Sequence, residues 1–344
     1  MTGYTMRQSL ILFLTAVIWG VAFVAQSAGM EHLGPFTYNG VRSVLGGLVL
    51  LPCIVLLNRI QGRNGSEETN TDGRLQQNPA VDGTVHSKLP SCSACRRAGR
   101  MAIQAVKVRD FHSNNRQLLT GGLCCGIILF AASNFQQFGI QYTTVGKAGF
   151  ITAMYILIVP VLGLLFHKKA GLQVWIGVLF GVTGLYLLCM QDSLRLDRGD
   201  ALVLVCAFIF SLHILVIDHF SQKVDGVKMS CIQFWVCGIL SLLCSVLFES
   251  PDLHSIVISW LPVCYGGIMS CGVAYTLQII GQKGMNPTVA SLILSLESVV
   301  SVIAGFLLLG QAMSRRELFG CLMMLMAIIF AQLPDRKKDI LAGK

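Results

Sequence analysis

Charged residues are scarce in this sequence. Asp, Glu, Lys and Arg make up 12% of its 344 residues, whereas a soluble globular domain carries about 25%. Hydrophobic residues make up 54%, and the mean hydropathy is +0.67. A water-soluble core could not hide this much apolar surface. The composition therefore excludes an ordinary soluble protein and indicates that lipid surrounds the chain.

Several motifs that support chemistry are also missing. The sequence has no glycine-rich phosphate-binding loop of the P-loop type, which argues against ATP hydrolysis by this chain. Its apolar segments contain no clustered acids and no pair of metal ligands, so we expect no enzyme activity, no cofactor and no metal. Eleven of the thirteen Cys fall within or at the ends of apolar segments. Cys usually packs there as a small residue, and we predict no disulfide framework.

Long apolar segments are present instead. Each approaches the roughly 20 residues that a helix needs to cross a bilayer, and runs of this length do not alternate as barrel strands do. We therefore predict an all-α membrane protein with ten transmembrane helices. The segments lie near residues 7–28, 36–57, 118–140, 146–166, 172–190, 200–218, 229–248, 256–280, 287–310 and 317–333. The first is longer than a signal-peptide core, so we expect it to be retained.

The last five apolar segments repeat the first five. In the first two segments of each half, identical residues recur at an offset of 191, as in Gly47/Gly238. In the next two the offset is 142, as in Gln136/Gln278, and in the last it is 143. Because five is an odd number, the second half must be inverted relative to the first. Two inverted five-helix repeats are typical of alternating-access transporters.

The change of offset indicates one insertion of 49 residues (191 − 142). It falls in the only long polar stretch, 58–117, for which we predict a disordered cytoplasmic loop. Cys92 and Cys95 form a CxxC pattern there, but a single pair is a weak metal signal, and we interpret it as ordinary loop. The predicted organisation is residues 1–57 for helices one and two of the first repeat, 58–117 for the insertion, 118–190 for helices three to five, 199–335 for the second repeat and 336–344 for a basic tail.

Basic residues are distributed unevenly between the loops. With a cytoplasmic N-terminus, the cytoplasmic side carries 20 Lys and Arg and the opposite side carries 5. This asymmetry predicts a multi-pass protein of the cell membrane with both termini in the cytoplasm. The net charge of +9 then follows from topology, and we expect no nucleic-acid partner.

Ionisable residues inside the apolar segments are candidates for solute binding or coupling, because a charge at the bilayer centre costs at least about 2.5 kcal/mol. Glu297 is the only acid deep in a segment, and the 142-residue offset places Tyr155 at its equivalent position. Glu297 could bind a cationic group, carry a coupling proton, or hold the bundle together by hydrogen bonding. Arg42 could snorkel outward, gate, or bind an anion. His213 could be a hydrogen-bonded core residue or a proton carrier.

Uncharged polar residues form stripes along other segments. Those of the third and eighth segments have matching spacing, so they indicate either a wet path between the halves or helix ends that emerge into headgroups. Serines of the ninth segment favour close helix packing. The complete set of candidates is Glu297, Tyr155, Trp19, Gln26, Arg42, Asn134, Gln137, His213, Tyr275, Gln278 and Ser298.

Short motifs in both halves resemble the EamA-type branch of the drug/metabolite transporter superfamily. The motifs are Ile18-Trp19-Gly20, Asn39-Gly40-Val41-Arg42 and Leu296-Glu297-Ser298-Val299-Val300 leading to Leu309-Gly310-Gln311. The resemblance implies a ten-helix transporter with a central cavity lined mainly by helices one, three, four, six, eight and nine. This sequence departs from the family pattern in several respects. Ser298 stands where the family usually has Pro, Gln311 and Lys168 stand where it often has Glu, and the long insertion is atypical.

We therefore expect a secondary transporter that exports a small polar or amphipathic metabolite by alternating access. The alternative is a receptor or regulatory membrane scaffold built on a transporter fold, which only the long insertion supports. The expected partners are a small-molecule solute and the lipid bilayer. The solute's identity, the coupling ion and a homodimer remain open.

Overall fold

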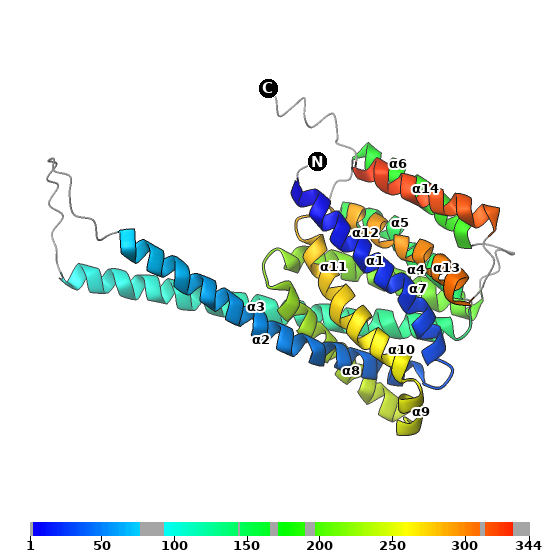
Figure 1. Ribbon diagram of the computed structural model, residues 1–344, viewed down its shortest axis with the longest axis horizontal. Helices are drawn as coiled ribbons and strands as arrows, with labels where there is room; N and C mark the ends of the chain where they lie inside the picture. Colours follow the sequence, from blue (N-terminus) through cyan, green and yellow to red (C-terminus); the bar gives the residue numbers. More distant parts are fainter. Residues whose placement is uncertain are drawn as a thin grey trace.

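The computed structural model describes residues 3–75, 93–143, 145–165, 171–189, 197–309 and 314–332. All secondary structure within these ranges is helical (Figure 1). The helices are α1 (Gly3–Gly29), α2 (Pro35–Leu75), α3 (Ser93–Ile140), α4 (Val145–Ala153), α5 (Tyr155–Leu165), α6 (Leu172–Cys189), α7 (Arg198–Ser221), α8 (Gly226–Phe248), α9 (Leu253–Ile258), α10 (Trp260–Cys264), the π-helix η1 (Tyr265–Ala274), α11 (Tyr275–Gln282), α12 (Pro287–Leu294), α13 (Leu296–Leu309) and α14 (Arg315–Gln332).

Many of these helices suit a bilayer. Seven stretches are long and apolar enough to cross it: Met6–Gly29, Pro35–Arg59, Asn115–Ile140, Arg198–Ser221, Gly226–Phe248, Trp260–Gln282 and Pro287–Ala304. Shorter apolar helices at Ile151–Leu165, Leu172–Gly184 and Leu318–Phe330 lie where the fourth, fifth and tenth spans are predicted. Large apolar side chains face outward, as on α8, where Val246 and Leu247 are 72% and 74% exposed. The all-helical membrane fold is therefore confirmed, whereas the count of ten spanning helices remains a prediction.

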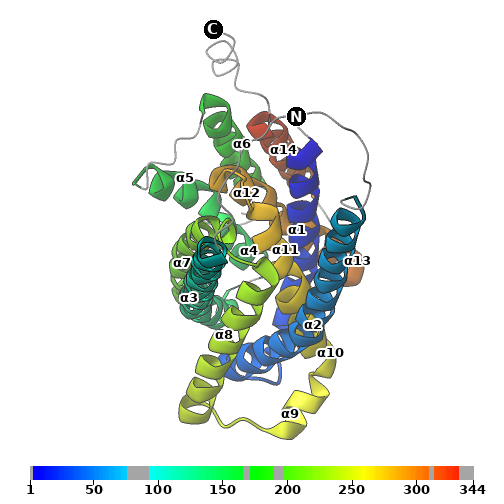
Figure 2. The same cartoon turned by 90° about the vertical axis from the view of Figure 1, so that its left-hand side faces the viewer.

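The main interfaces join the predicted first half to the predicted second half. α2 packs on α8, α3 on α7 and α8, and α1 on α13, while α6 and α14 pack on each other at the edge of the bundle (Figures 1 and 2). Glycines allow this close approach. A Cβ added at Gly126 would lie 2.6 Å from Val236 Cβ, and one at Gly238 would lie 2.8 Å from Val44 Cγ2. Small residues therefore let helices of the two halves pack closely against each other.

Two predicted helices are interrupted at related places. Met154 separates α4 from α5, and Ser295 separates α12 from α13. The backbone tightens at both breaks, because Leu157 N–H donates to the Met154 carbonyl and Ser298 N–H donates to the Ser295 carbonyl, three residues back. As a result, α5 and α13 begin within the bundle, close to the candidate residues Tyr155 and Glu297.

The predicted disordered insertion at 58–117 differs from the structure. α2 continues to Leu75 and α3 begins at Ser93, and both helices project beyond the bundle (Figure 1). Once a membrane helix is nucleated, each added residue gains one backbone hydrogen bond at little cost, and 93–117 contains several good helix formers, among them Ala, Arg and Gln. Residues 76–92, including Cys92 of the CxxC pattern, lie outside the described residues.

Candidate functional site

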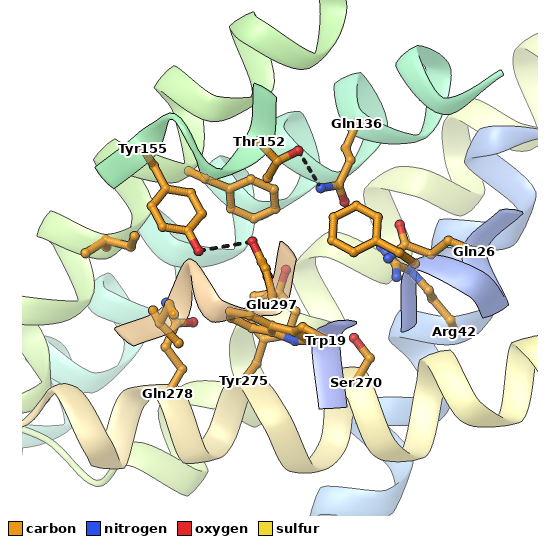
Figure 3. Close-up of a pocket in the computed structure, with 14 residues that line it drawn as sticks. Trp19, Gln26, Arg42, Gln136, Thr152, Tyr155, Ser270, Tyr275, Gln278 and Glu297 are labelled. Carbon is orange, nitrogen blue, oxygen red and sulfur yellow. Dashed lines mark hydrogen bonds between the residues drawn. The ribbon is translucent and has the colours of Figure 1, made fainter. Parts of the chain in front are cut away.

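A small cavity of about 40 Å³ lies in the interior of the bundle. Aromatic, amide and charged side chains share its lining (Figure 3). The lining residues are Trp19, Phe23, Gln26, Arg42, Gln136, Thr152, Tyr155, Phe210, Ile214, Ser270, Tyr275, Gln278, Leu294 and Glu297. These residues lie on the six helices that the family resemblance implies as the cavity lining, and Arg42 adds a seventh, α2.

Tyr155 forms a hydrogen bond with Glu297, the single acidic residue among these lining residues. The Tyr155 hydroxyl donates a hydrogen bond of 3.0 Å to Glu297 Oε1 (Figure 3). Both side chains are buried, at 3% and 4% exposure. Tyr155 is the first residue of α5, and Glu297 lies in the first turn of α13. The hydrogen bond therefore joins the start of one helix to the start of another.

Most lining residues occur in pairs at the sequence offsets of the repeat. The paired residues are Trp19/Phe210 and Phe23/Ile214 at an offset of 191, and Gln136/Gln278, Thr152/Leu294 and Tyr155/Glu297 at an offset of 142. Ten of the fourteen lining residues belong to these five pairs. Equivalent positions of the two sequence repeats therefore face the same space.

Arg42 and Gln26 lie toward one end of the cavity, Tyr155 and Gln278 toward the other, and Glu297 reaches between them (Figure 3). The guanidinium carbon of Arg42 lies 5.3 Å from the centre of the Tyr38 ring. Within the described ranges, Arg42 Nε has no hydrogen-bond partner and the side chain forms no ion pair. The cavity thus contains one basic and one acidic side chain that are not paired with each other.

An aromatic cluster forms one wall of the cavity. The rings of Trp19 and Tyr275 meet edge to face with centroids 4.6 Å apart. Behind Tyr275 lie Phe234 at 5.3 Å and His213 at 6.1 Å, again edge to face. Trp19 Nε1 is buried without a hydrogen-bond partner among the described residues. This wall offers an apolar surface and one free donor.

Four of the predicted candidates do not line the cavity. Asn134, Gln137, His213 and Ser298 are all buried. Gln137 Nε2 donates to the Gln26 carbonyl at 3.3 Å, His213 Nε2 pairs with Gln233 Oε1 at 3.3 Å, and Ser298 Oγ donates to the Gly149 carbonyl at 3.1 Å. These three hydrogen bonds connect neighbouring helices.

Asn134 belongs to a polar junction between three helices. Its Nδ2 donates to the Phe130 carbonyl at 2.7 Å and to Ser241 Oγ at 3.1 Å. Its Oδ1 accepts a hydrogen bond of 3.0 Å from Asn39 Nδ2. The junction therefore ties α3 to α2 and α8 and leaves no polar group of Asn134 directed at the cavity.

Sequence reasoning missed other lining residues. Gln136 Nε2 donates to Thr152 Oγ1 at 3.2 Å, and Ser270 lies on η1. The identity Gln136/Gln278 at the repeat offset was the signal that could have identified Gln136. The apolar lining residues carried no such signal, because an apolar residue in an apolar segment can face lipid, protein or a cavity equally well. Within the ranges that the structure describes, no group of three or more His, Cys, Asp or Glu could hold a metal ion.

Known proteins share both the sequence pattern and the fold. The profile of the EamA-like transporter family matches residues 6–68, 101–190 and 197–332. An uncharacterized transporter of Archaeoglobus fulgidus is 25% identical over 327 residues, covering 94% of this chain and 84% of its own length. The uncharacterized inner membrane transporter YedA of Escherichia coli strain K12 is 20% identical over 332 residues, covering 94% and 89%. A crystal structure that is 17% identical covers 96% of this chain and 98% of its own, with a TM-score of 0.67.

The family match extends over most of the chain and includes the helices that form the cavity. Residues 69–100, which the profile leaves out, fall inside the predicted insertion. Members of this family are transporters and not enzymes. This chain belongs to the EamA-like transporter family and is a multi-pass membrane transporter of a small-molecule solute.

Proposed function

We propose that this protein is a secondary transporter that exports a small polar or amphipathic metabolite across the cell membrane by alternating access. In this proposal ten helices form two inverted five-helix repeats, both termini are cytoplasmic, and the solute binds in the cavity between the halves. The observation that carries the proposal is the set of five residue pairs, related by the repeat offsets, that face one cavity.

The interrupted helices support the same proposal. Secondary transporters commonly bind their solutes beside helices that are broken near the middle of the membrane. Here the breaks at Met154 and Ser295 lie beside Tyr155 and Glu297. The three shorter apolar helices stand where the remaining spans are expected. The excess of basic residues in alternate loops supports the cytoplasmic termini.

The Tyr155–Glu297 hydrogen bond supplies a means of coupling. It joins α5 of the first half to α13 of the second half. A solute or proton can shift the balance between two states only if its interactions differ between them. We assign the coupling proton to Glu297, since protonation changes the strength of its bond to Tyr155 and therefore the contact between the halves.

Reconstituted protein tests this function directly. A thermal-shift screen of the purified protein against amino acids, nucleosides, organic cations and organic anions identifies a binding solute. Proteoliposomes loaded with that solute should then take up its radiolabelled form by counterflow, unlike protein-free liposomes. Binding without counterflow would contradict a transporter and favour the receptor or scaffold alternative.

A further inference from the structure

We propose that Arg42 is the binding subsite for an anionic group of the solute, and that the solute is an amphipathic organic anion with a carboxylate head and an apolar body. This inference rests on the proposed function, because it names the solute class for the same cavity. It assigns different roles to the two charged lining residues: Arg42 binds solute, and Glu297 couples.

The first argument is the unbalanced charge of Arg42. The side chain is only 4% exposed, and no acidic side chain of the described chain pairs with it. The Tyr38 ring covers one face of the guanidinium at 5.3 Å. A buried cation without a counter-ion is costly, and a ring offsets this cost only in part. A bound anion would remove most of the cost.

The second argument is that the fold already positions this side chain. The Arg42 stem lies against η1, since a Cβ added at Gly266 would meet Arg42 Cδ at 3.3 Å. Tyr38, one helical turn before Arg42, is fully buried, and its hydroxyl donates to the Pro262 carbonyl at 3.3 Å. Arg42 is therefore held at the cavity wall and cannot snorkel freely toward the membrane surface.

The third argument is the chemistry of the neighbouring groups. Trp19 Nε1 and Arg42 Nε are both buried N–H donors without acceptors among the described residues, and the Ser270 hydroxyl lines the same cavity. Figure 3 places Trp19, Ser270 and Arg42 on the same side of the cavity. A carboxylate has two oxygens and about four acceptor sites, and it pairs well with a planar guanidinium. Gln26 lies beside Arg42, and its unpaired Oε1 supplies an acceptor but no compensating charge.

The rest of the lining suits an apolar body. The Trp19–Tyr275 wall, together with Phe23 and Phe210, presents aromatic surface in the same cavity as Arg42. The carboxyl group of Glu297 already accepts a hydrogen bond from Tyr155 and has no donor to offer a carboxylate when it is ionised. A carboxylate should therefore bind at Arg42 while its body lies along the rings.

Probes that share one carbon skeleton test this directly. The full-length protein in nanodiscs is titrated with cinnamate, cinnamyl alcohol and cinnamylamine, and binding is followed by tryptophan fluorescence and thermal shift. We expect cinnamate to bind most tightly. Arg42→Gln should weaken cinnamate binding by at least about tenfold and leave cinnamyl alcohol within about twofold. Arg42→Lys should restore part of the preference for the anion, since it keeps the charge without the planar donor geometry.

Two further variants separate binding from folding. Arg116→Gln removes an exposed arginine of α3 and should leave all three affinities unchanged. Trp19→Phe keeps a ring but removes the N–H donor, and it should weaken cinnamate severalfold without reversing the order of the probes. This second variant tests the subsite even if Arg42→Gln fails to fold.

Three results would overturn the inference: binding of cinnamylamine as tight as that of cinnamate, an anion preference that survives Arg42→Gln, or no binding of cinnamate. Counterflow of the same probes distinguishes the two proposals. Transport of the alcohol or amine but not of cinnamate would leave the transporter intact and refute the anion subsite. Arg42-dependent binding of cinnamate without counterflow would support the subsite and refute transport.

Discussion

Tyr155 and Glu297 are 142 residues apart in the sequence, and the hydroxyl of the first donates a 3.0 Å hydrogen bond to the carboxyl oxygen of the second. The same offset relates the third and fourth apolar segments to the eighth and ninth. A direct contact between equivalent positions is expected where a pseudo-two-fold axis passes through a structure. In the proposed mechanism, this contact couples the two halves.

Removal of the titratable group at this contact should uncouple transport. Glu297→Gln keeps the shape and can still accept from Tyr155, but it cannot bind or release a proton. We expect counterflow exchange to continue in proteoliposomes, because exchange needs no proton gradient, while gradient-driven accumulation falls to the level of protein-free liposomes. Tyr155→Phe is the matched variant, since it keeps the carboxyl group but removes the hydrogen bond through which protonation of Glu297 would act, and it should also lose driven accumulation while counterflow continues. Full accumulation with an unchanged pH profile in Glu297→Gln would contradict a role of Glu297 in coupling.

Glu249 should stabilise the start of α2 from the far end of α8. Its Oε1 accepts from Phe36 N–H at 2.9 Å, and its Oε2 accepts from Thr37 N–H at 2.8 Å and from Thr37 Oγ1 at 2.6 Å. Glu249→Ala should lower the free energy of unfolding by about 1–2 kcal/mol, because it removes a charged cap from free N–H groups. Hydrogen exchange at Phe36 and Thr37 should accelerate. Glu31→Ala, at an exposed nearby acid, is the control and should have little effect.

Asp252 should make the short helix α9 sensitive to acid. Its carboxylate accepts from Ser255 N–H at 3.1 Å and from Ser255 Oγ at 3.2 Å. Hydrogen bonding to the carboxylate holds the pKa of Asp252 below its ordinary value of 3.8, and the bond from the Ser255 backbone N–H contributes most. The stabilisation is therefore complete above pH 3.8 and is lost as the pH falls from there through the lowered pKa.

Hydrogen exchange of Leu253–Ile258 measured across this acidic range should show the helix fraying. Asp252→Asn keeps an acceptor but does not titrate, so its exchange should be insensitive to pH after correction for intrinsic rates. Equal pH dependence in the two proteins would show that another group controls the start of α9.

The projecting ends of α2 and α3 should be dispensable for transport. Both extend beyond the bundle, and the cavity is lined entirely by residues outside 58–117 (Figure 1). Deletion of residues 62–112 should therefore leave counterflow rates close to those of the complete chain. Loss of transport in a deletion protein that still elutes as a folded species would favour the regulatory-scaffold alternative.

Much of the site could be predicted because polar residues stand out in apolar segments. Glu297, Arg42, Trp19 and Gln278 are conspicuous in this sequence, and all four line the cavity. Asn134 was equally conspicuous, yet it faces a helix junction. The rotation of the helix about its axis decides between these two outcomes, and hydrophobic periodicity does not define that rotation, since lipid tails are as apolar as the protein interior.

The amino-acid sequence by itself determined that lipid surrounds this protein and that its secondary structure is helical, because segments this long and apolar are stable only as helices in lipid. It also determined which polar residues had to be protected from the hydrocarbon. Tertiary structure decided where the helices break, how far α2 and α3 extend, and which polar groups share one cavity. These features depend on helix rotation and on contacts between residues more than a hundred positions apart, such as Tyr155 and Glu297, and a linear pattern does not encode them.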